Sequence, residues 1–124
     1  MMLQELYERQ SIRKYQAKPV EEEKIEQLLR AAMQAPSARN TQSWRFLVVT
    51  NRAALDSMVE LQPYTGMMKS APCAIIVLGD RTAEENDAYL YVNAAAAIEN
   101  MLIEAVNQGL GTCWCAIAPN AERI

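Results

Sequence analysis

Three stretches of the sequence carry apolar residues at helical spacing. The clearest is residues 20–35, whose apolar positions share one helix face that we expect to pack into the core; they are Ile25, Leu28, Leu29, Ala32 and Met33. Three glutamates at positions 21–23 suit the positive end of a helix dipole, and Pro36 ends the helix. Shorter amphipathic patterns predict helices over residues 2–10 and 52–61.

The longest predicted helix covers residues 87–108 and is apolar on nearly every face. Its polar residues trace a single stripe; they are Asn93, Asn100, Glu104 and Asn107. The alanines at 94–97 would let another backbone approach closely, and the "GLG" at 109–111 ends the helix. We expect a helix of this kind to lie in the core of a domain or in a subunit interface.

Apolar runs predict three strands, over residues 45–50, 73–79 and 112–118. The last two lack polar alternation, which is typical of strands buried on both faces. Residues 119–124, "PNAERI", predict the first turn of a further helix with Asn120 as its cap. The mixture of helices and strands indicates an α+β domain that occupies residues 1–124.

Composition narrows the classes of function. The 124 residues are 51% apolar, which supports a packed core, and the net charge of −3 argues against a general nucleic-acid surface. Because the chain has no histidine, Ser-His-Asp and Cys-His catalysis are excluded, and its one C-x-C pair is too little for a zinc site. The sequence shows neither a signal-peptide pattern nor a bilayer-spanning apolar run, so we expect a cytoplasmic protein without a membrane partner.

A local basic cluster stands out against this acidic background. In "ERQSIRKY", Arg9 and Arg13 flank Ser11, and alternate residues of an extended segment point to one side. Guanidinium and hydroxyl donors in this arrangement suit a phosphate. Taken alone, the cluster is better explained by ordinary surface chemistry, with solvated arginines and a serine that caps a turn.

Two further stretches offer candidate binding groups. In "APSARNTQSW", Ser37, Asn40 and Gln42 could read the polar edge of a planar heterocycle, although such residues are also common in plain loops. In "GLGTCWCA", Trp114 offers a flat face, and the apolar residues around Cys113 and Cys115 favour buried, structural thiols over redox-active ones.

Together these motifs resemble the nitroreductase family of FMN-dependent oxidoreductases. "RQSIRKY" is similar to the family's Arg-x-Ser-x-Arg pattern, and "APSARNTQSWRFLVV" to its Pro-Ser-x-x-Asn-x-Gln-Pro-Trp loop and following strand. "AAAAIENMLIEAVNQGLGTCWCA" is similar to its long central helix and the turn after it. The resemblance covers essentially the whole chain, with the motifs in the family's order.

The resemblance implies a fold and a cofactor site. The implied fold is a central mixed, largely antiparallel sheet flanked by helices, in a homodimer formed through the long helix. FMN would be held at its phosphate by Arg9, Ser11 and Arg13 with the backbone around Gln10. Its ring or ribityl chain would lie along the partner subunit's loop, and its reactive nitrogen would meet backbone groups at the turn after the helix. These loop and turn residues are Pro36, Ser37, Ala38 and Asn40, and Trp114 and Cys115.

The implied activity is hydride transfer from NADH or NADPH, through FMN, to nitroaromatic, quinone or flavin acceptors, with the chemistry carried by the flavin rather than by a side chain. Other flavin reactions on the same fold, such as dehalogenation or enone reduction, stay open, as does a truncated, non-catalytic flavin-binding protein. Two departures from the family are visible. Ser43 stands where the family usually has proline, which we expect only to loosen that turn, and the family's C-terminal portion is expected to be missing.

Overall fold

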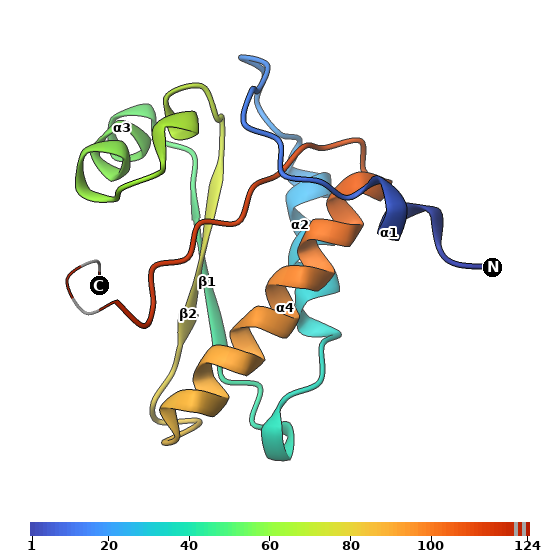
Figure 1. Cartoon of the computed structure of the whole chain (residues 1–124), viewed down its shortest axis with the longest axis vertical. Helices are drawn as coiled ribbons and strands as arrows, with labels where there is room; N and C mark the ends of the chain where they lie inside the picture. The colour runs from blue at the N-terminus through green and yellow to red at the C-terminus, as the bar shows by residue number, and fades with distance from the viewer. Residues whose placement is uncertain (121, 123) are drawn as a thin grey trace.

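A computed structural model describes residues 1–120, 122 and 124, and these form helices packed around a two-stranded antiparallel sheet (Figure 1). The α+β class expected from the sequence is confirmed. In chain order the elements are α1 (Gln4–Glu8), α2 (Glu22–Met33), η1 (Ala38–Asn40), β1 (Trp44–Val49), α3 (Arg52–Leu61), η2 (Gly66–Lys69), β2 (Ala74–Gly79) and α4 (Asp87–Asn107).

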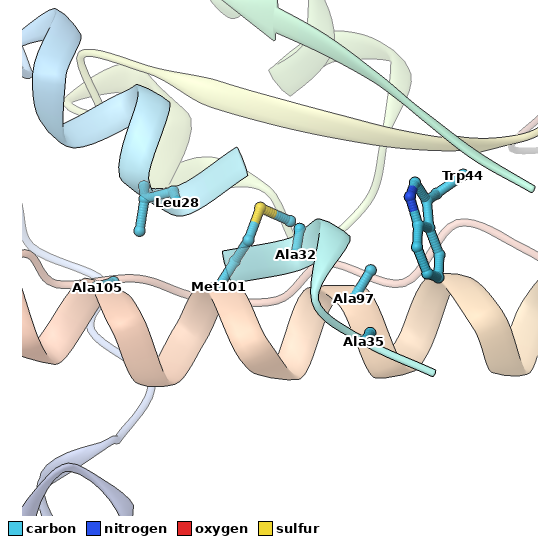
Figure 2. Close-up of a cluster of buried hydrophobic side chains, with 7 residues drawn as sticks. All are labelled: Leu28, Ala32, Ala35, Trp44, Ala97, Met101 and Ala105. Carbon is cyan, nitrogen blue, oxygen red and sulfur yellow. The ribbon is translucent and has the colours of Figure 1, made fainter. Parts of the chain in front are cut away.

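The core lies where α2, α4 and β1 meet (Figure 2). Ala32 of α2 and Ala97 and Ala105 of α4 are fully buried, so the two helices approach closely along small side chains. Trp44 at the start of β1 is 5% exposed and closes one end of this cluster, while Met101 fills its middle. The alanine-rich face of the long helix therefore packs inside the chain, as one of the two sequence expectations allowed.

The sheet is less deeply buried than its sequence predicts. β1 and β2 pair antiparallel with Trp44 opposite Gly79 and Val49 opposite Ala74. Phe46, Ile75 and Val77 pack toward the core, whereas Leu47 and Leu78 remain about half exposed. The expectation that residues 73–79 are buried on both faces is therefore wrong, because the core cluster packs against one face of these strands.

Both ends of α4 are fixed by local hydrogen bonds. The side chain of Asn86 caps the start by accepting the backbone N–H of Ala88 at 2.9 Å. At the other end Gly109 has a φ of +75°, and the N–H of Leu110 donates to the carbonyl of Ala105 at 2.8 Å. This is the glycine-terminated helix end that "GLG" predicts.

The third predicted strand, over residues 112–118, does not form. Its backbone pairs at one place, where Thr112 makes an isolated parallel bridge to Ser11. A strand needs a continuous ladder of partners, and the residues after Thr112 run on as irregular chain with Trp114 45% exposed. The bridge lies outside the sheet and is the single parallel pairing among the described residues. The sheet itself, β1 with β2, is antiparallel, whereas the resemblance implies a mixed, largely antiparallel one.

Two smaller expectations also change. Met33 is 50% exposed rather than in the core, because it follows the buried Ala32 and a helix turns by about 100° per residue. The N-terminal helix covers Gln4–Glu8 rather than residues 2–10. The helical turn expected at 119–124 falls partly outside the described residues.

Among the described residues, no helix combines the length and apolar character needed to cross a bilayer. Nor does this part of the chain gather three side chains of the kinds that commonly ligate metals into one possible metal site.

Candidate functional site

The basic N-terminal segment lies directly beside the turn that follows α4. The N–H of Ile12 donates to the carbonyl of Thr112 at 2.8 Å, next to the Ser11–Thr112 bridge. A Cβ at Gly111 would lie 3.0 Å from the side chain of Ile12, so a larger residue would have to push this side chain away. Two of the three sequence motifs are thereby joined, although nearly a hundred residues separate them in the chain. We name this region, residues 9–13 and 111–116, the N-terminal half of the site.

Two cavities flank this half, one on each side of the extended segment. The smaller, about 270 Å³, is lined by Gln10 and Ile12 and by the turn after α4. The larger, about 460 Å³, is lined by Arg13, Pro63, Tyr64, Met67, Cys113, Trp114, Cys115 and Ala116. The neighbouring residues Ile12 and Arg13 thus line different cavities, as alternation along an extended segment predicts.

The wall opposite Trp114 is built by the residues between α3 and β2. Arg52 at the start of α3 donates to the carbonyl of Ala71 at 2.9 Å and also to that of Met68. These bonds tie α3 to η2 and so hold the segment that carries Tyr64 and Met67 against the cavity. The sequence motifs gave no indication of this wall.

The ionisable groups of the N-terminal half lie close together. Burial, and then the nearby Cys113 and Cys115, raise the pKa of Tyr15 to about 12 although Arg13 opposes the shift. Burial and the neighbouring Cys113 likewise raise the pKa of the Cys115 thiol. Both groups are therefore neutral at pH 7, and the cavity's positive charge comes from Arg13.

Arg9 already has an anionic neighbour within the chain. Its Nε lies 3.9 Å from a carboxylate oxygen of Glu99 on α4, and both side chains are partly exposed. An exposed pair at this distance is weak. A phosphate can therefore compete with Glu99 for the guanidinium at small cost.

The second half of the site is the loop from Pro36 to Gln42. Its backbone is unusual because Arg39, Asn40 and Gln42 all have positive φ, at 53°, 56° and 47°. The Ser37 hydroxyl accepts the N–H of Gln42 at 3.0 Å, and the side-chain carbonyl of Asn40 accepts the Gln42 amide at 2.9 Å. Such conformations cost energy in non-glycine residues and persist only when the surroundings hold them.

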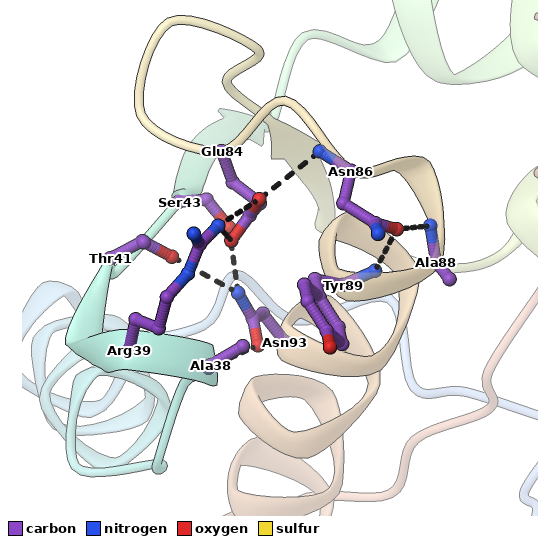
Figure 3. Close-up of polar contacts among 9 residues, drawn as sticks. All are labelled: Ala38, Arg39, Thr41, Ser43, Glu84, Asn86, Ala88, Tyr89 and Asn93. Atoms are coloured by element: carbon purple, nitrogen blue, oxygen red, sulfur yellow. Dashed lines mark hydrogen bonds and ion pairs between the residues drawn. The ribbon is translucent and has the colours of Figure 1, made fainter.

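One support of this loop is Asn93, buried on α4 at 2% exposure (Figure 3). Its carbonyl oxygen accepts the N–H of Ala38 at 3.0 Å, and its amide donates to the Ser43 hydroxyl at 3.0 Å and, more weakly, to Thr41 at 3.4 Å. Asn93 thus fixes both ends of the loop to the long helix. The polar stripe on that helix is the sequence signal that could have found it.

A second support is the carboxylate of Glu84, whose side chain is fully buried (Figure 3). It accepts the N–H of Asn86 at 3.1 Å and two hydrogen bonds from the exposed guanidinium of Arg39, at 3.0 and 3.2 Å. The backbone donor at Asn86 and the cation at Arg39 hold the pKa of Glu84 below its ordinary value despite burial. Nothing in the sequence around Glu84 distinguishes it from an ordinary turn residue.

Ser43 does not loosen the turn, so that expectation is wrong. Its side chain is 1% exposed and is bonded to Asn93, and its carbonyl accepts the N–H of Asp80 at 2.8 Å. The serine therefore adds a hydrogen bond between the loop and α4 that proline could not provide. We name residues 36–43 with Glu84 and Asn93 the loop half of the site.

The two halves lie at opposite ends of α4 (Figure 1). The loop is fixed at Asn93, whereas the turn that pairs with Ser11 and Ile12 follows the helix end at Asn107. The side chain of Arg9 reaches Glu99, between these two points. Fourteen residues of helix separate Asn93 from Asn107, about 20 Å at 1.5 Å per residue. Within one chain, the predicted residues therefore form two separate groups, with Arg13, Trp114 and Cys115 in one and Ser37, Ala38 and Asn40 in the other.

Comparison with known proteins points in one direction. A family model described as the nitroreductase family matches residues 6–65 and 57–124. A candidate NADH dehydrogenase/NAD(P)H nitroreductase from Methanothermobacter thermautotrophicus is 40% identical over 123 residues, which are 99% of this chain. The chain spans only 64% of the length of that relative.

Solved structures agree with the sequence comparison. A candidate NADH oxidase from Clostridium acetobutylicum superposes with a TM-score of 0.93 at 43% identity, over 97% of this chain and 72% of the other. A candidate nitroreductase in complex with FMN from Desulfovibrio desulfuricans superposes with a TM-score of 0.85 at 33% identity, over 91% of this chain and 66% of the other.

Proposed function

Because the chain belongs to the nitroreductase family, we propose that it forms an FMN-dependent oxidoreductase that takes hydride from NADH or NADPH and passes it to nitroaromatic, quinone or flavin acceptors. The observation that carries the proposal is the meeting of Arg13 with Trp114 and Cys115 at one cavity of about 460 Å³. This volume lies within the range of about 300–1,000 Å³ that small-molecule sites occupy.

The described residues carry the kinds of chemical group that bind the phosphate and the ring of FMN. Arg9, Ser11 and Arg13 would hold the phosphate with charge-assisted hydrogen bonds, joined by the backbone around Gln10. The close approach of Gly111 to Ile12 keeps this segment against the turn after α4. The irregular chain at Trp114 and Cys115 would offer backbone groups to the isoalloxazine ring. FMN supplies hydride transfer when bound, and the residues of this chain bind and orient it.

We further propose that each site is shared between two subunits of a homodimer. Pro36, Ser37, Ala38 and Asn40 would reach FMN bound at the N-terminal half of the partner. The lining of the 460 Å³ cavity supports this arrangement, because it includes Arg13 and Trp114 but no residue of the loop from Pro36 to Gln42 of the same chain. A two-fold axis would pair the loop half of each subunit with the N-terminal half of the other, giving two equivalent sites.

The cofactor and activity are tested on the purified protein. We expect it to bind FMN, to release FMN rather than FAD on heating as identified by mass, and to lose flavin absorbance at 450 nm on anaerobic addition of NADH or NADPH. A protein that binds FMN but is reduced by neither nucleotide would contradict the enzymatic proposal. A protein that binds no added flavin would contradict both the proposed cofactor and the proposed activity.

Subunit sharing is tested by mixing two defective chains. Arg13→Ala damages the N-terminal half and Asn40→Ala the loop half, and each variant alone should bind FMN weakly. If the two chains are co-expressed and pair at random, half of the dimers are mixed and one of the two sites in each is intact, so about one quarter of all sites should bind tightly. A titration of the mixture without a tight class would show that each site is built within one subunit.

A further inference from the structure

The thiols of Cys113 and Cys115 have no part in the proposed function, which uses only the backbone at Cys115, yet the structure does not bury them fully. Both are half-buried and both line the 460 Å³ cavity. They flank Trp114 in the irregular chain after α4, where the predicted strand does not form. A redox interpretation set aside on the sequence alone therefore has to be considered again.

The two thiols are close along the chain. Cys113 and Cys115 are separated by the single residue Trp114, and both line the same cavity. The Cys113 thiol lies 3.9 Å from the carbonyl of Trp114, at the limit for a sulfur donor. The spacing in the chain and the shared cavity thus place both thiols on the same side of the segment.

We propose that Cys113 and Cys115 form a dithiol modification site, which a hydroperoxide closes to an intramolecular disulfide. One sulfur attacks the peroxide, forms a sulfenic acid and releases an alcohol or water. The second sulfur displaces hydroxide from the first, which leaves as water, and the S–S bond forms. Overall, two thiols and one hydroperoxide give one disulfide, one alcohol and one water, and two electrons pass from sulfur to the peroxide.

Closing the disulfide reshapes the cavity wall. Two residues apart in extended chain, Cα atoms are separated by about 6.6 Å. This lies near the upper limit of about 6.8 Å for a disulfide, whose preferred separation is about 5.5–6 Å. Closing the bond fixes the chain between the cysteines, and the residue repositioned by this change is Trp114. Disulfides exposed at a cavity are readily reduced, so the modification is reversible by dithiols.

The site is tested on the wild-type chain without bound flavin. After treatment with hydrogen peroxide and alkylation of remaining thiols, trypsin separates the cysteines, because residues 82–123 contain Cys113 and Cys115 whereas residues 70–81 contain Cys73. We expect the 82–123 fragment to lose the mass of two hydrogen atoms and to take up no alkyl group, and dithiothreitol to reverse both changes. An alkylated fragment, a fragment carrying added oxygen, or a disulfide between chains on a non-reducing gel would overturn the proposal.

Two further measurements test adjacency and the effect on the cavity. Phenylarsine oxide, which bridges neighbouring thiols with loss of water, should add once to the reduced wild type and not to Cys113→Ser or Cys115→Ser. In Trp44→Phe, Trp114 is the sole tryptophan, and its emission should shift on oxidation in that variant but not when Cys115→Ser is added. If phenylarsine oxide adds equally to the wild type and the single-cysteine variants, the two thiols are not neighbours and the proposal is wrong. If the Trp114 emission does not shift on oxidation, the proposed change in the cavity wall is wrong. None of these measurements uses the flavin, so they are independent of the proposed function.

Discussion

The two ends of α4 hold the two halves of the site in different ways. At its N-terminal end, Asn93 and Glu84 fix the loop half with side-chain hydrogen bonds from buried positions (Figure 3). At its C-terminal end, the N-terminal half is joined to the turn by backbone pairing at Ser11 and Ile12, while Ser11 and Arg13 stay exposed. One half is organised in advance by the chain, and the other offers charge and hydroxyl groups to a ligand.

This difference fits the roles that we propose for the two halves. In the proposed dimer, a loop that reaches the neighbouring subunit has to keep its shape without help from its own cavity, so its positive φ angles need buried supports. A phosphate site needs donors that exchange water for the ligand, and internal partners would only compete. Substitutions in the loop half should therefore act mainly on stability, and those in the N-terminal half mainly on binding.

The largest effect is expected for Asn93→Ala. The change leaves the Ala38 N–H and the Ser43 hydroxyl without their partner, and each buried polar group left unpaired costs about 1–3 kcal/mol. We expect the free energy of unfolding to fall by about 2–4 kcal/mol, measured by urea denaturation. FMN affinity should fall as well, because the loop half would lose its shape.

Asn100→Ala is the matched control. It removes another asparagine from the same helix, whose amide makes one hydrogen bond, to the carbonyl of Ala31 at 3.0 Å. Its cost should be about 1 kcal/mol, with FMN affinity unchanged. Equal losses of stability and affinity in the two variants would show that Asn93 supports the helix in general and not the loop.

Arg13→Ala should reverse this pattern. Loss of one charge-assisted contact of about 1.5–3 kcal/mol predicts FMN binding weaker by about 10–100-fold, with the free energy of unfolding nearly unchanged. Titration of the apoprotein, followed by flavin fluorescence, measures the affinity. Lys14→Ala, the adjacent exposed cation, serves as the control. If both substitutions weaken binding equally, the cluster acts through its net charge and not through a contact at Arg13.

Glu84→Gln should change how the stability of the loop half depends on pH. The folded pKa of Glu84 lies below its ordinary value of 4.5, so its stabilising contribution is present above that pH and is lost as the pH falls through the folded pKa. The urea midpoint of the wild type should therefore decrease more between about pH 5 and pH 3 than that of Glu84→Gln. Glu60→Gln, on the exposed side of α3, is the control, and parallel curves for all three proteins would contradict the role of Glu84.

The pattern of apolar residues located the helices and strands that bury a continuous apolar face or run of their own. The apolar spacing in α2 and α4 and the runs in β1 and β2 placed these elements within one or two residues. Periodicity failed at residues 112–118, because an apolar run shows that a segment can be a strand but not that a neighbouring strand is present. It also failed at Met33, because a helix turns by about 100° per residue and Met33 is half exposed although the preceding Ala32 is fully buried.

The sequence predicted which stretches carry the binding groups of the candidate site. It did not predict which distant residues hold these stretches in place. The stretches around Arg13, Asn40 and Trp114 could be found because each gathers binding groups within a few residues. Their supports lie far away in sequence, since Asn93 and Glu84 bond to residues 45 or more positions earlier. A buried asparagine on an apolar helix needs polar partners, so Asn93 could have been singled out. The sequence contained no comparable signal for Glu84.

The smallest effect is expected for Cys113→Ala combined with Cys115→Ala, which should leave turnover per bound flavin unchanged. Burial and the neighbouring thiol raise the pKa of Cys115, and the proposed function assigns hydride transfer to the flavin and to no thiol. The measurement is reduction of a quinone by NADH or NADPH, normalised to bound FMN. The variant should differ from the wild type only in that hydrogen peroxide can no longer form the disulfide at the cavity wall. If FMN stays bound and turnover is lost, the pair carries electrons, and the N-terminal half would hold catalytic chemistry of its own rather than binding groups alone.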